Sequence, residues 1–137
     1  MIYGTGIDII EIERVARVWH RKKQRFLDRV YTPYEQQRCL DGGPRSQAER
    51  LAVRFAAKEA VMKALGTGWR QGVRWRDIEI HHEQSGKPYV YLQGSTRDLA
   101  MSRGIGTIYI SLSHSRDYAV ASAIALHDTS VVSKETG

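Results

Sequence analysis

The sequence predicts an α+β fold in which one long central helix packs on a small antiparallel β-sheet. Three observations lead to it: a β-branched segment at residues 2–10, an apolar segment with helical period at 46–65, and strand-like segments joined by short turns over 77–126. With 137 residues and 42% hydrophobic content, the chain has enough apolar material for one modest core. We therefore expect a single domain over residues 1–126, followed by a polar, flexible tail at 127–137.

The first predicted strand has the sequence IYGTGIDII. Its alternation places Gly4, Gly6, Asp8 and Ile10 on one face of the strand. Asp8 therefore follows two residues on its face that have no side chain. This pattern predicts an open spot, where a ligand could approach the backbone and the carboxylate together.

The next segment, residues 11–31, has the pattern of an amphipathic and strongly basic helix. Apolar residues recur at helical spacing from Ile12 to Trp19, and arginines form a second stripe. Another helix is expected to begin after Thr32, because Thr32 and Glu35 have the spacing of a capping box. The basic stripe consists of Arg14, Arg17, Arg21 and Arg25.

The long helix is predicted to begin near Ser46 and to end at Leu65. Ser46 and Glu49 repeat the capping-box pattern at its start, and Gly66 is the residue type that commonly follows a helix end. Apolar side chains are distributed around most of its circumference, which indicates burial on several sides.

The second half of the chain is rich in predicted strands. The last two are separated by a short turn at Arg116 and Asp117 and should form a hairpin. Alternation places His114 where the apolar face of the first of these two strands ends. The predicted strands are 77–82, 88–93, 107–115 and 117–126, and a short helix is expected at 95–102.

Charge and cysteine content limit the classes of function. The chain has 21 Lys and Arg residues against 15 Asp and Glu, a net charge of +6 that attracts anionic partners. The single cysteine, Cys39, cannot form an internal disulfide, which is compatible with a reducing compartment. No apolar run approaches the roughly 20 residues that span a bilayer, and the first residues lack the pattern of a secretion signal. We therefore expect a soluble, cytoplasmic protein.

The segment RFAAKEAVMKALG of the long helix places Glu59 and Lys63 in line with apolar side chains. One interpretation is a solvent-exposed ion pair four residues apart, which contributes only about 0.2–0.5 kcal/mol. Burial would make such a pair costly, and ionisable groups on core-facing stripes are enriched at functional sites. Spacing alone leaves both interpretations open.

Two carboxylates, Asp8 and Glu59, are the first candidates for a site. One or two carboxylates together with substrate phosphates are the ligands that Mg²⁺ prefers. Lys63 and His114 would then neutralise phosphate charge during transfer. These four residues form a coherent set for phosphoryl chemistry, although nothing in the spacing shows that they meet in space.

Other reactive residue types fit their patterns less well. The serines around His114 in SLSHS lack the glycines of a nucleophile elbow, which disfavours a serine hydrolase. His81 and His82 are adjacent on a predicted strand and point to opposite faces, a poor geometry for chelating a metal. Cys39 has no evident partner histidine, so a small apolar role is favoured.

The basic stripe has a simple interpretation as a solvated helix face. Its single sign over more than two turns also favours an acidic protein surface or a phosphate backbone as a partner. Nucleic acid is the weaker candidate, because no zinc spacing, recognition helix or aromatic stacking motif accompanies the charge.

Five stretches of the sequence form a specific ordered pattern. They are GIDIIEIERV (6–15), RFAAKEAVMKALGTG (54–68), DIEI (77–80), GKP (86–88) and SLSHSRDYAVA (111–121). In this order they resemble the holo-acyl carrier protein synthases, the small group of 4′-phosphopantetheinyl transferases. The resemblance covers nearly the whole chain up to Leu126.

The resemblance implies the 4′-phosphopantetheinyl transferase fold and its activity. This family transfers 4′-phosphopantetheine from coenzyme A to a serine of an apo-acyl carrier protein in lipid and fatty acid biosynthesis, with Mg²⁺ as cofactor and adenosine 3′,5′-bisphosphate as product. The implied partners are coenzyme A and an acidic acyl carrier protein, and neither nucleic acid nor a membrane is expected.

The resemblance also implies roles for individual residues. Asp8 and Glu59 match the metal-binding acidic residues, and Glu59 is the candidate for assisting deprotonation of the serine. Lys63 matches a lysine that contacts phosphate and stabilises the leaving group, and His114 matches a histidine near the coenzyme A phosphates. Glu59, Lys63 and His114 are thus the expected catalytic residues. The expected cofactor-binding residues are Lys58, Lys63, Gly66, Pro88 and His114.

The basic stripe gains a partner from the resemblance. Arg14 matches an arginine that docks the acidic helix of the carrier protein, and Arg17 and Arg21 would extend the docking surface. Opposite charges across such an interface steer the encounter and fix its register more than they add affinity.

The resemblance to the small members of the family also implies a homotrimer with active sites between subunits. The resemblance implies that Asp8 and His114 come from one chain and Glu59 and Lys63 from its neighbour. A subunit interface would explain why a short chain carries an ionisable pair on a stripe otherwise destined for burial.

Overall fold

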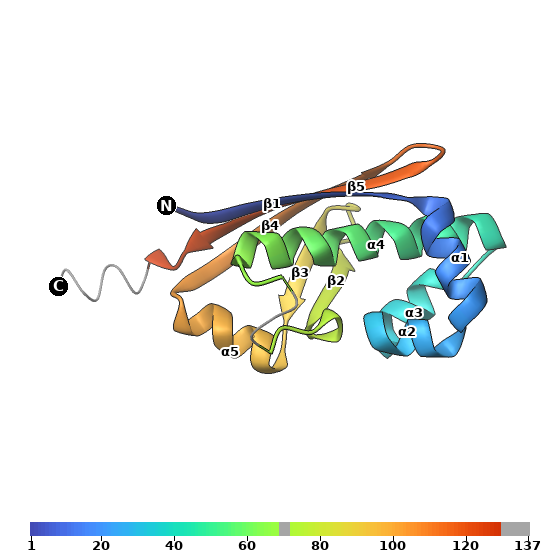
Figure 1. Cartoon of the computed structure of the whole chain (residues 1–137). Helices are drawn as coiled ribbons and strands as arrows, with labels where there is room; N and C mark the ends of the chain where they lie inside the picture. The colour runs from blue at the N-terminus through green and yellow to red at the C-terminus, as the bar shows by residue number, and fades with distance from the viewer. Residues whose placement is uncertain (69–71, 130–137) are drawn as a thin grey trace.

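The computed structural model of the chain describes residues 1–68 and 72–129, and its architecture is mixed α+β (Figure 1). The predicted α+β class with a small antiparallel sheet is thereby confirmed. In chain order the elements are β1 (Ile2–Glu11), α1 (Ile12–Lys22), α2 (Gln24–Val30), α3 (Pro33–Cys39), α4 (Pro44–Leu65), the 3₁₀ helix η1 (Trp75–Asp77), β2 (Ile78–His82), β3 (Pro88–Leu92), α5 (Gly94–Ser102), β4 (Ile105–His114) and β5 (Tyr118–His127).

The larger sheet has the strand order β1-β5-β4, with antiparallel pairing throughout. β4 and β5 form the predicted hairpin, whose turn is closed by a 2.9 Å hydrogen bond from the Ser115 amide to the Tyr118 carbonyl. β1 pairs with the other edge of β5, so the first and last strands lie side by side (Figure 1). β2 and β3 form a separate antiparallel pair.

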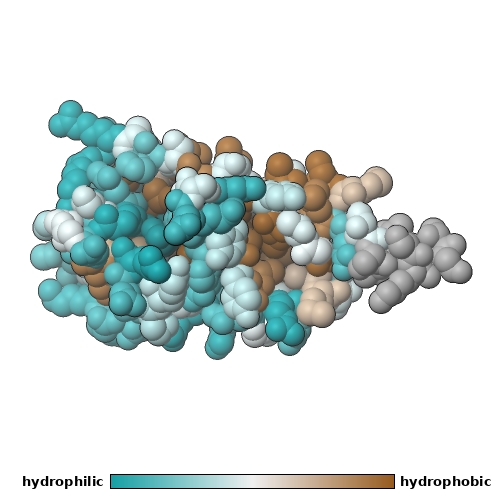
Figure 2. Space-filling model, turned by 180° about the vertical axis from the view of Figure 1, so that it is seen from behind, coloured by the Kyte–Doolittle hydropathy of each residue, from teal (hydrophilic) through white to brown (hydrophobic). Residues whose placement is uncertain are grey.

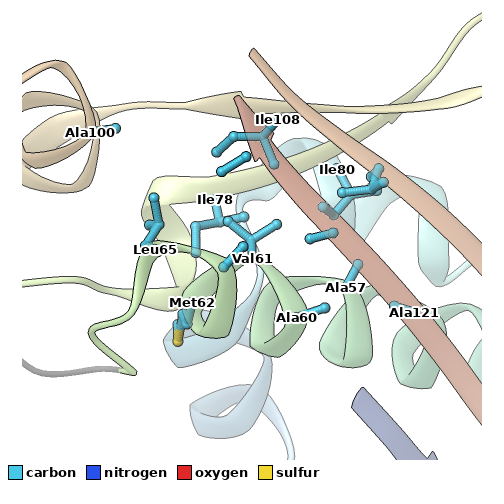
Figure 3. Close-up of a cluster of buried hydrophobic side chains, with 14 of the residues drawn as sticks. Ala57, Ala60, Val61, Met62, Leu65, Ile78, Ile80, Ala100, Ile108 and Ala121 are labelled. Atoms are coloured by element: carbon cyan, nitrogen blue, oxygen red, sulfur yellow. The ribbon is translucent and has the colours of Figure 1, made fainter. Parts of the chain in front are cut away.

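The core lies where α4 packs against both sheets. Apolar side chains of α4 around Val61 are buried against Ile78 and Ile80 of β2 and Ile108 of β4 (Figure 3). Each Å² of apolar surface removed from water contributes about 25 cal/mol, so this contact holds the two sheets on one helix. α4 ends as predicted, because Gly66 adopts a left-handed φ of 80° directly after it.

β1 approaches α4 so closely that a side chain would not fit at two of its positions. A Cβ atom at Gly4 would meet the carbonyl oxygen of Ala64, and one at Gly6 would meet the carbonyl oxygen of Ala60. The prediction of open space over these glycines is therefore wrong, since the backbone that approaches them is that of α4, whereas Asp8 itself lines a cavity. The close packing brings Asp8 next to the helix.

The predicted single helix over residues 11–31 is also wrong. Lys23 has a φ of 52° and separates α1 from α2. The polar run around Lys23 interrupts the apolar period, and the change of direction lets Phe26 and Leu27 reach the buried cluster that also contains Ile12 and Val15. Two short helices thus cover this core where one straight helix could not.

One of the two predicted capping boxes is confirmed. At the start of α3, Thr32 Oγ1 accepts from the Glu35 amide at 3.2 Å, and Glu35 Oε1 accepts from the Thr32 amide at 3.0 Å. The box predicted at Ser46 and Glu49 does not form, because α4 already begins at Pro44. Proline fits the first helical position, where its fixed φ is helical and its missing N–H costs nothing.

The described chain continues past the predicted domain boundary at Leu126. β5 includes His127, and the Asp128 amide donates to the Gly104 carbonyl at 2.7 Å. Residues 130–137 of the predicted tail lie outside the described residues, so the flexible tail stays a prediction. Among the described residues, no helix is both long enough and apolar enough to cross a membrane.

Candidate active site

Asp8, Glu59 and Lys63 of the same chain come together where β1 packs on α4. Lys63 Nζ donates to the Ile7 carbonyl at 2.8 Å and lies 3.2 Å from Asp8 Oδ1. In the described part of the chain, the salt bridge of Lys63 is thus with Asp8, and the helix pair with Glu59 does not form. Asp8 and Glu59 line one cavity with a volume of about 510 Å³.

The Glu59 carboxylate is half-buried and held by an aromatic side chain. The indole N–H of Trp75 donates to Glu59 Oε1 at 3.0 Å. Burial is the main cause that raises the pKa of Glu59 above its ordinary value; the Trp75 hydrogen bond opposes this rise, and the Asp8 charge adds to it. Glu59 is therefore a carboxylate whose negative charge the folded chain does not fully compensate.

The two carboxylates fit a magnesium ion that takes its remaining ligands from elsewhere. Within residues 1–68 and 72–129, no group of three or more His, Cys, Asp and Glu side chains could hold a metal by itself. Mg²⁺ usually combines one or two carboxylates with phosphate oxygens and water, and this donor set matches Asp8 and Glu59 beside a phosphate-bearing ligand. A bound cation would relieve the electrostatic repulsion between the Asp8 and Glu59 carboxylates.

The wall of the Asp8–Glu59 cavity is basic on one side and apolar on another. Basic side chains attract anionic ligands into such a cleft, and apolar ones exclude water from it. The basic residues come from α1 and α2, and the aromatic ones from α2, α4 and η1. They are Arg14, Lys22, Arg25, Arg29, Phe26, Phe55 and Trp75.

The three arginines predicted to dock a carrier protein do not share one cavity. Arg14 lines the Asp8–Glu59 cavity, whereas Arg17 lines a neighbouring cavity together with Trp19. Arg21 is exposed near the end of α1. Arg29 was not singled out from the sequence, although it follows Arg25 at helical spacing on α2 and lines the Asp8–Glu59 cavity with it.

His114 lies elsewhere in the chain, near the other end of α4. Its Nδ1 is 3.8 Å from Glu49 Oε2, and it lines a second cavity of about 360 Å³ with Arg50 and Arg54. Glu49 and Lys63 are about 21 Å apart along the helix axis, at the 1.5 Å rise per residue of an α-helix. One chain therefore does not bring His114 to the other predicted site residues.

The predicted division of the site residues between neighbouring chains needs correction. Asp8 lies beside Glu59 and Lys63 of its own chain, because β1 packs closely against α4. His114 of the same chain lies apart from this group, beside Glu49.

Lys58 was expected to bind coenzyme A, and the structure places it in the core. Its side chain is fully buried, and its ammonium group donates to Glu35 Oε1 at 2.6 Å, to the Ile78 carbonyl at 2.6 Å and to the Trp75 carbonyl at 3.0 Å. Burial lowers the pKa of Lys58, against the raising effect of the Glu35 charge. Because an ammonium group has three donors and all are used, this prediction is wrong for Lys58.

The two remaining residues expected to bind coenzyme A lie on the surface or half-buried. Gly66 is exposed after the end of α4. Pro88 begins β3 and pairs with His82, which lines the same cavity as His114. Among the described residues, neither lines the Asp8–Glu59 cavity, and their part in binding stays a prediction.

The clearest residue that sequence reasoning missed is Trp75. It lies two positions before the DIEI stretch, and no local pattern marks it as part of a site. Its contact with Glu59 joins residues 16 positions apart in the chain. Such a contact depends on packing and leaves no periodic signal in the sequence.

Comparison with known proteins identifies the family. The family model of the 4′-phosphopantetheinyl transferase superfamily matches residues 4–123. The chain belongs to this superfamily. The predicted resemblance is therefore confirmed. Asp8, Glu59 and Lys63 of this transferase all lie within the matched region.

Individual relatives narrow the group within the superfamily. The chain is 47% identical over 124 residues to the holo-[acyl-carrier-protein] synthase of Koribacter versatilis, which covers 90% of this chain and 98% of the relative. The crystal structure of the holo-[acyl-carrier-protein] synthase from Neisseria meningitidis aligns with a TM-score of 0.81 at 35% identity. The alignment covers 92% of this chain and 99% of that structure. The Helicobacter pylori synthase in complex with coenzyme A has a TM-score of 0.78 at 30% identity and covers 89% and 99%. These likenesses confirm that this transferase is an enzyme of the holo-acyl carrier protein synthase group.

Proposed function

We propose that this transferase moves 4′-phosphopantetheine from coenzyme A to a serine of an apo-acyl carrier protein, in a Mg²⁺-dependent reaction that releases adenosine 3′,5′-bisphosphate. The observation that carries the proposal is that Asp8 and Glu59 line one cavity and Lys63 pairs with Asp8, in a chain whose family match spans residues 4–123. The Helicobacter pylori relative, solved in complex with coenzyme A, supports coenzyme A as the donor.

The proposed step transfers one phosphoryl group between two oxygens. The serine oxygen forms a bond to the phosphorus that carries pantetheine, the bond from this phosphorus to the bridging oxygen breaks, and the bisphosphate leaves. Glu59 accepts the serine proton, because its carboxylate lines the cavity that the serine must enter. Lys63 stabilises the negative charge that develops on the leaving phosphate. A Mg²⁺ ion held by Asp8 and Glu59 would neutralise the pyrophosphate.

The position of Arg14 supports an acidic carrier protein as the second substrate. Arg14 lines the cavity that the serine must enter, while Arg17 and Arg21 continue the positive charge along α1. We therefore propose that the carrier docks over α1 and delivers its serine toward Glu59. A role in lipid and fatty acid biosynthesis and a cytoplasmic location are part of the same proposal.

A homotrimer with sites between subunits is supported by the outer face of the larger sheet. Figure 2 shows hydrophobic residues at the surface over the half of the molecule away from α1–α3. On the outer face, Ile7 and Ile9 of β1 are each 64% exposed, and Tyr109 and Ile124 on the neighbouring strands are exposed as well. Exposed apolar faces of this kind mark interaction surfaces. We propose that a neighbouring chain covers this face and supplies its His114 to the Asp8–Glu59 cavity.

A mass-shift assay tests the function. Incubation with coenzyme A, Mg²⁺ and an apo carrier protein should add one phosphopantetheine mass to the carrier, and Glu59→Gln should nearly abolish the addition. Glu83→Gln, at an exposed turn, is the matched control and should transfer normally. An unchanged mass with several apo carriers would exclude the proposal. Tight, salt-sensitive nucleic-acid binding that does not depend on coenzyme A or Mg²⁺ would favour a polyanion-binding module instead.

A further inference from the structure

Consecutive residues of α4 hold Trp75 from two sides. Lys58 Nζ donates to the backbone carbonyl of Trp75 at 3.0 Å, and the indole N–H of Trp75 donates to Glu59 Oε1 at 3.0 Å. The Lys58 ammonium is itself anchored in the core by the Glu35 carboxylate and the Ile78 carbonyl. The backbone at Trp75 is therefore attached to a fully buried polar group of the core.

The indole ring is held as well as the backbone. Phe55 packs against it with ring centroids 5.9 Å apart, and the Arg29 guanidinium lies 5.5 Å from its centroid on the cavity side. Trp75 and Phe55 both line the Asp8–Glu59 cavity. The position of the indole N–H is thus set by contacts that do not involve Glu59.

A glutamate carboxylate needs such a partner to keep one orientation. Its terminal torsion joins an sp³ to an sp² carbon and has broad, roughly two-fold preferences, so the rotamer does not orient the oxygens. A fixed N–H group that donates to Oε1 does orient the two oxygens. An indole donor also carries no charge, so it orients Glu59 without pairing with the negative charge that a cation requires.

We propose that Trp75 is the positioning residue of Glu59: its indole N–H binds Oε1, so that the carboxylate presents its remaining lone pairs to Mg²⁺ and to the incoming serine hydroxyl. This inference rests on the proposed function. Partners that orient a metal-ligating side chain from behind commonly contribute about 10- to 100-fold in metal affinity or activity. Trp75 lines the cavity but takes no part in the bond changes, and its N–H acts through Glu59.

Trp75→Phe tests the proposal, because it keeps an aromatic wall and removes the N–H. We expect kcat to fall about 10- to 100-fold, and the Mg²⁺ concentration at half-maximal rate to rise, with little change in KM for the carrier protein. Tyr91→Phe, at an exposed position of β3 away from this cavity, removes one polar hydrogen from another aromatic ring and is the matched control, which should leave all three quantities unchanged. A Trp75→Phe enzyme with kcat and Mg²⁺ dependence within about twofold of the unmodified chain would overturn the proposal, because the expected effect is about tenfold or more.

A spectroscopic measurement separates positioning from a merely structural role. The chain has three tryptophans, so its ¹⁵N-labelled form should give three indole N–H signals, and Trp75→Phe identifies the one from Trp75. Addition of Mg²⁺ and coenzyme A, without a carrier protein, should move that signal, and Glu59→Ala should move it in the free enzyme. If the Trp75 indole signal shifts neither on addition of Mg²⁺ and coenzyme A nor in the Glu59→Ala variant, the proposal is contradicted. Because this readout needs no turnover, it tests the positioning of Glu59 even if the mass-shift assay shows no transfer.

Discussion

Lys58 and Glu35 form an ion pair of 2.6 Å in which both side chains are fully buried. The pair joins α4 to α3, and Glu35 Oε2 also accepts from the Ile80 amide at 2.9 Å, which adds β2 to the same network. Two charges removed from water are tolerated there because each is paired and hydrogen-bonded. Lys58 was expected to bind coenzyme A, but its ion pair with Glu35 instead connects α4, α3 and β2.

Removal of the Lys58 ammonium should destabilise the fold strongly. Lys58→Met leaves the Glu35 charge buried without its partner, and such losses cost about 3–5 kcal/mol of unfolding free energy. Urea denaturation measures the change. Adding Glu35→Gln should recover part of the loss, because it removes the unpaired charge. Arg45→Ala, which breaks the exposed Arg45–Glu49 pair, is the control and should cost about 0–1 kcal/mol; a similar small loss for Lys58→Met would contradict the prediction.

Gly6→Ala should disturb the contact between β1 and α4. The new methyl group would meet the Ala60 carbonyl oxygen and lie 2.9 Å from Lys63 Cβ, so strand and helix must separate. Overpacking of this kind costs about 1–3 kcal/mol in thermal or urea unfolding, and activity should fall because Asp8 moves with the strand. Gly43→Ala is the matched control, since it adds the same methyl group where no atom lies within 4 Å and φ is −82°. Equal stability of both variants would refute the packing account.

Glu59 should make the metal-free protein less stable at neutral pH than its amide variant. Burial raises its folded pKa above the ordinary 4.5, so the folded state binds more protons than the unfolded state between these two values. Stability from this group is therefore lost as the pH rises through that window. In EDTA at pH 7, Glu59→Gln should unfold at an equal or higher urea concentration than the unmodified chain, and the difference should shrink below pH 4.5. A variant that is clearly less stable at pH 7 would argue that the charged carboxylate is fully compensated.

Mixed oligomers should show which residues share a chain. His114→Ala mixed with Glu59→Gln should regain activity, because some sites would combine an intact Asp8–Glu59–Lys63 group with an intact His114 from the next chain; random assembly of a closed ring predicts about a quarter of the sites. Asp8→Asn mixed with Glu59→Gln should stay inactive, since both changes affect the same group. Recovery in the second mixture, and none in verified oligomers of the first, would reverse this assignment.

Cys39 should be unreactive in the folded protein. It is fully buried at the end of α3, and burial is the main cause that raises the pKa of its thiol to about 11. Because the thiolate is the reactive form, labelling by a disulfide reagent at pH 8 should be slow and should become fast in denaturant. Rapid labelling of the native chain would show that this end of α3 opens. The apolar role predicted from the sequence agrees with this burial.

Local patterns in the sequence were informative wherever structure depends on neighbours along the chain. The Thr32–Glu35 capping box, the left-handed Gly66 after α4 and the β4–β5 hairpin follow from residue types at short spacing. The failures have a common origin in packing. The break at Lys23 and the purpose of Gly6 depend on surfaces contributed by distant segments.

Most elements, the family and the residue types suited to Mg²⁺ and phosphate could be predicted from the sequence alone. Periodicities of 2 and 3.6 residues and cap chemistry are local properties, which one chain segment expresses without the rest. Which of these residues meet depends on the packing of the whole chain. That packing pairs Lys63 with Asp8 across β1 and α4, holds Glu59 against the indole of Trp75, and places His114 near the far end of the helix. Side chains reach only a few ångströms, so their partners depend on how closely and in which register the elements pack.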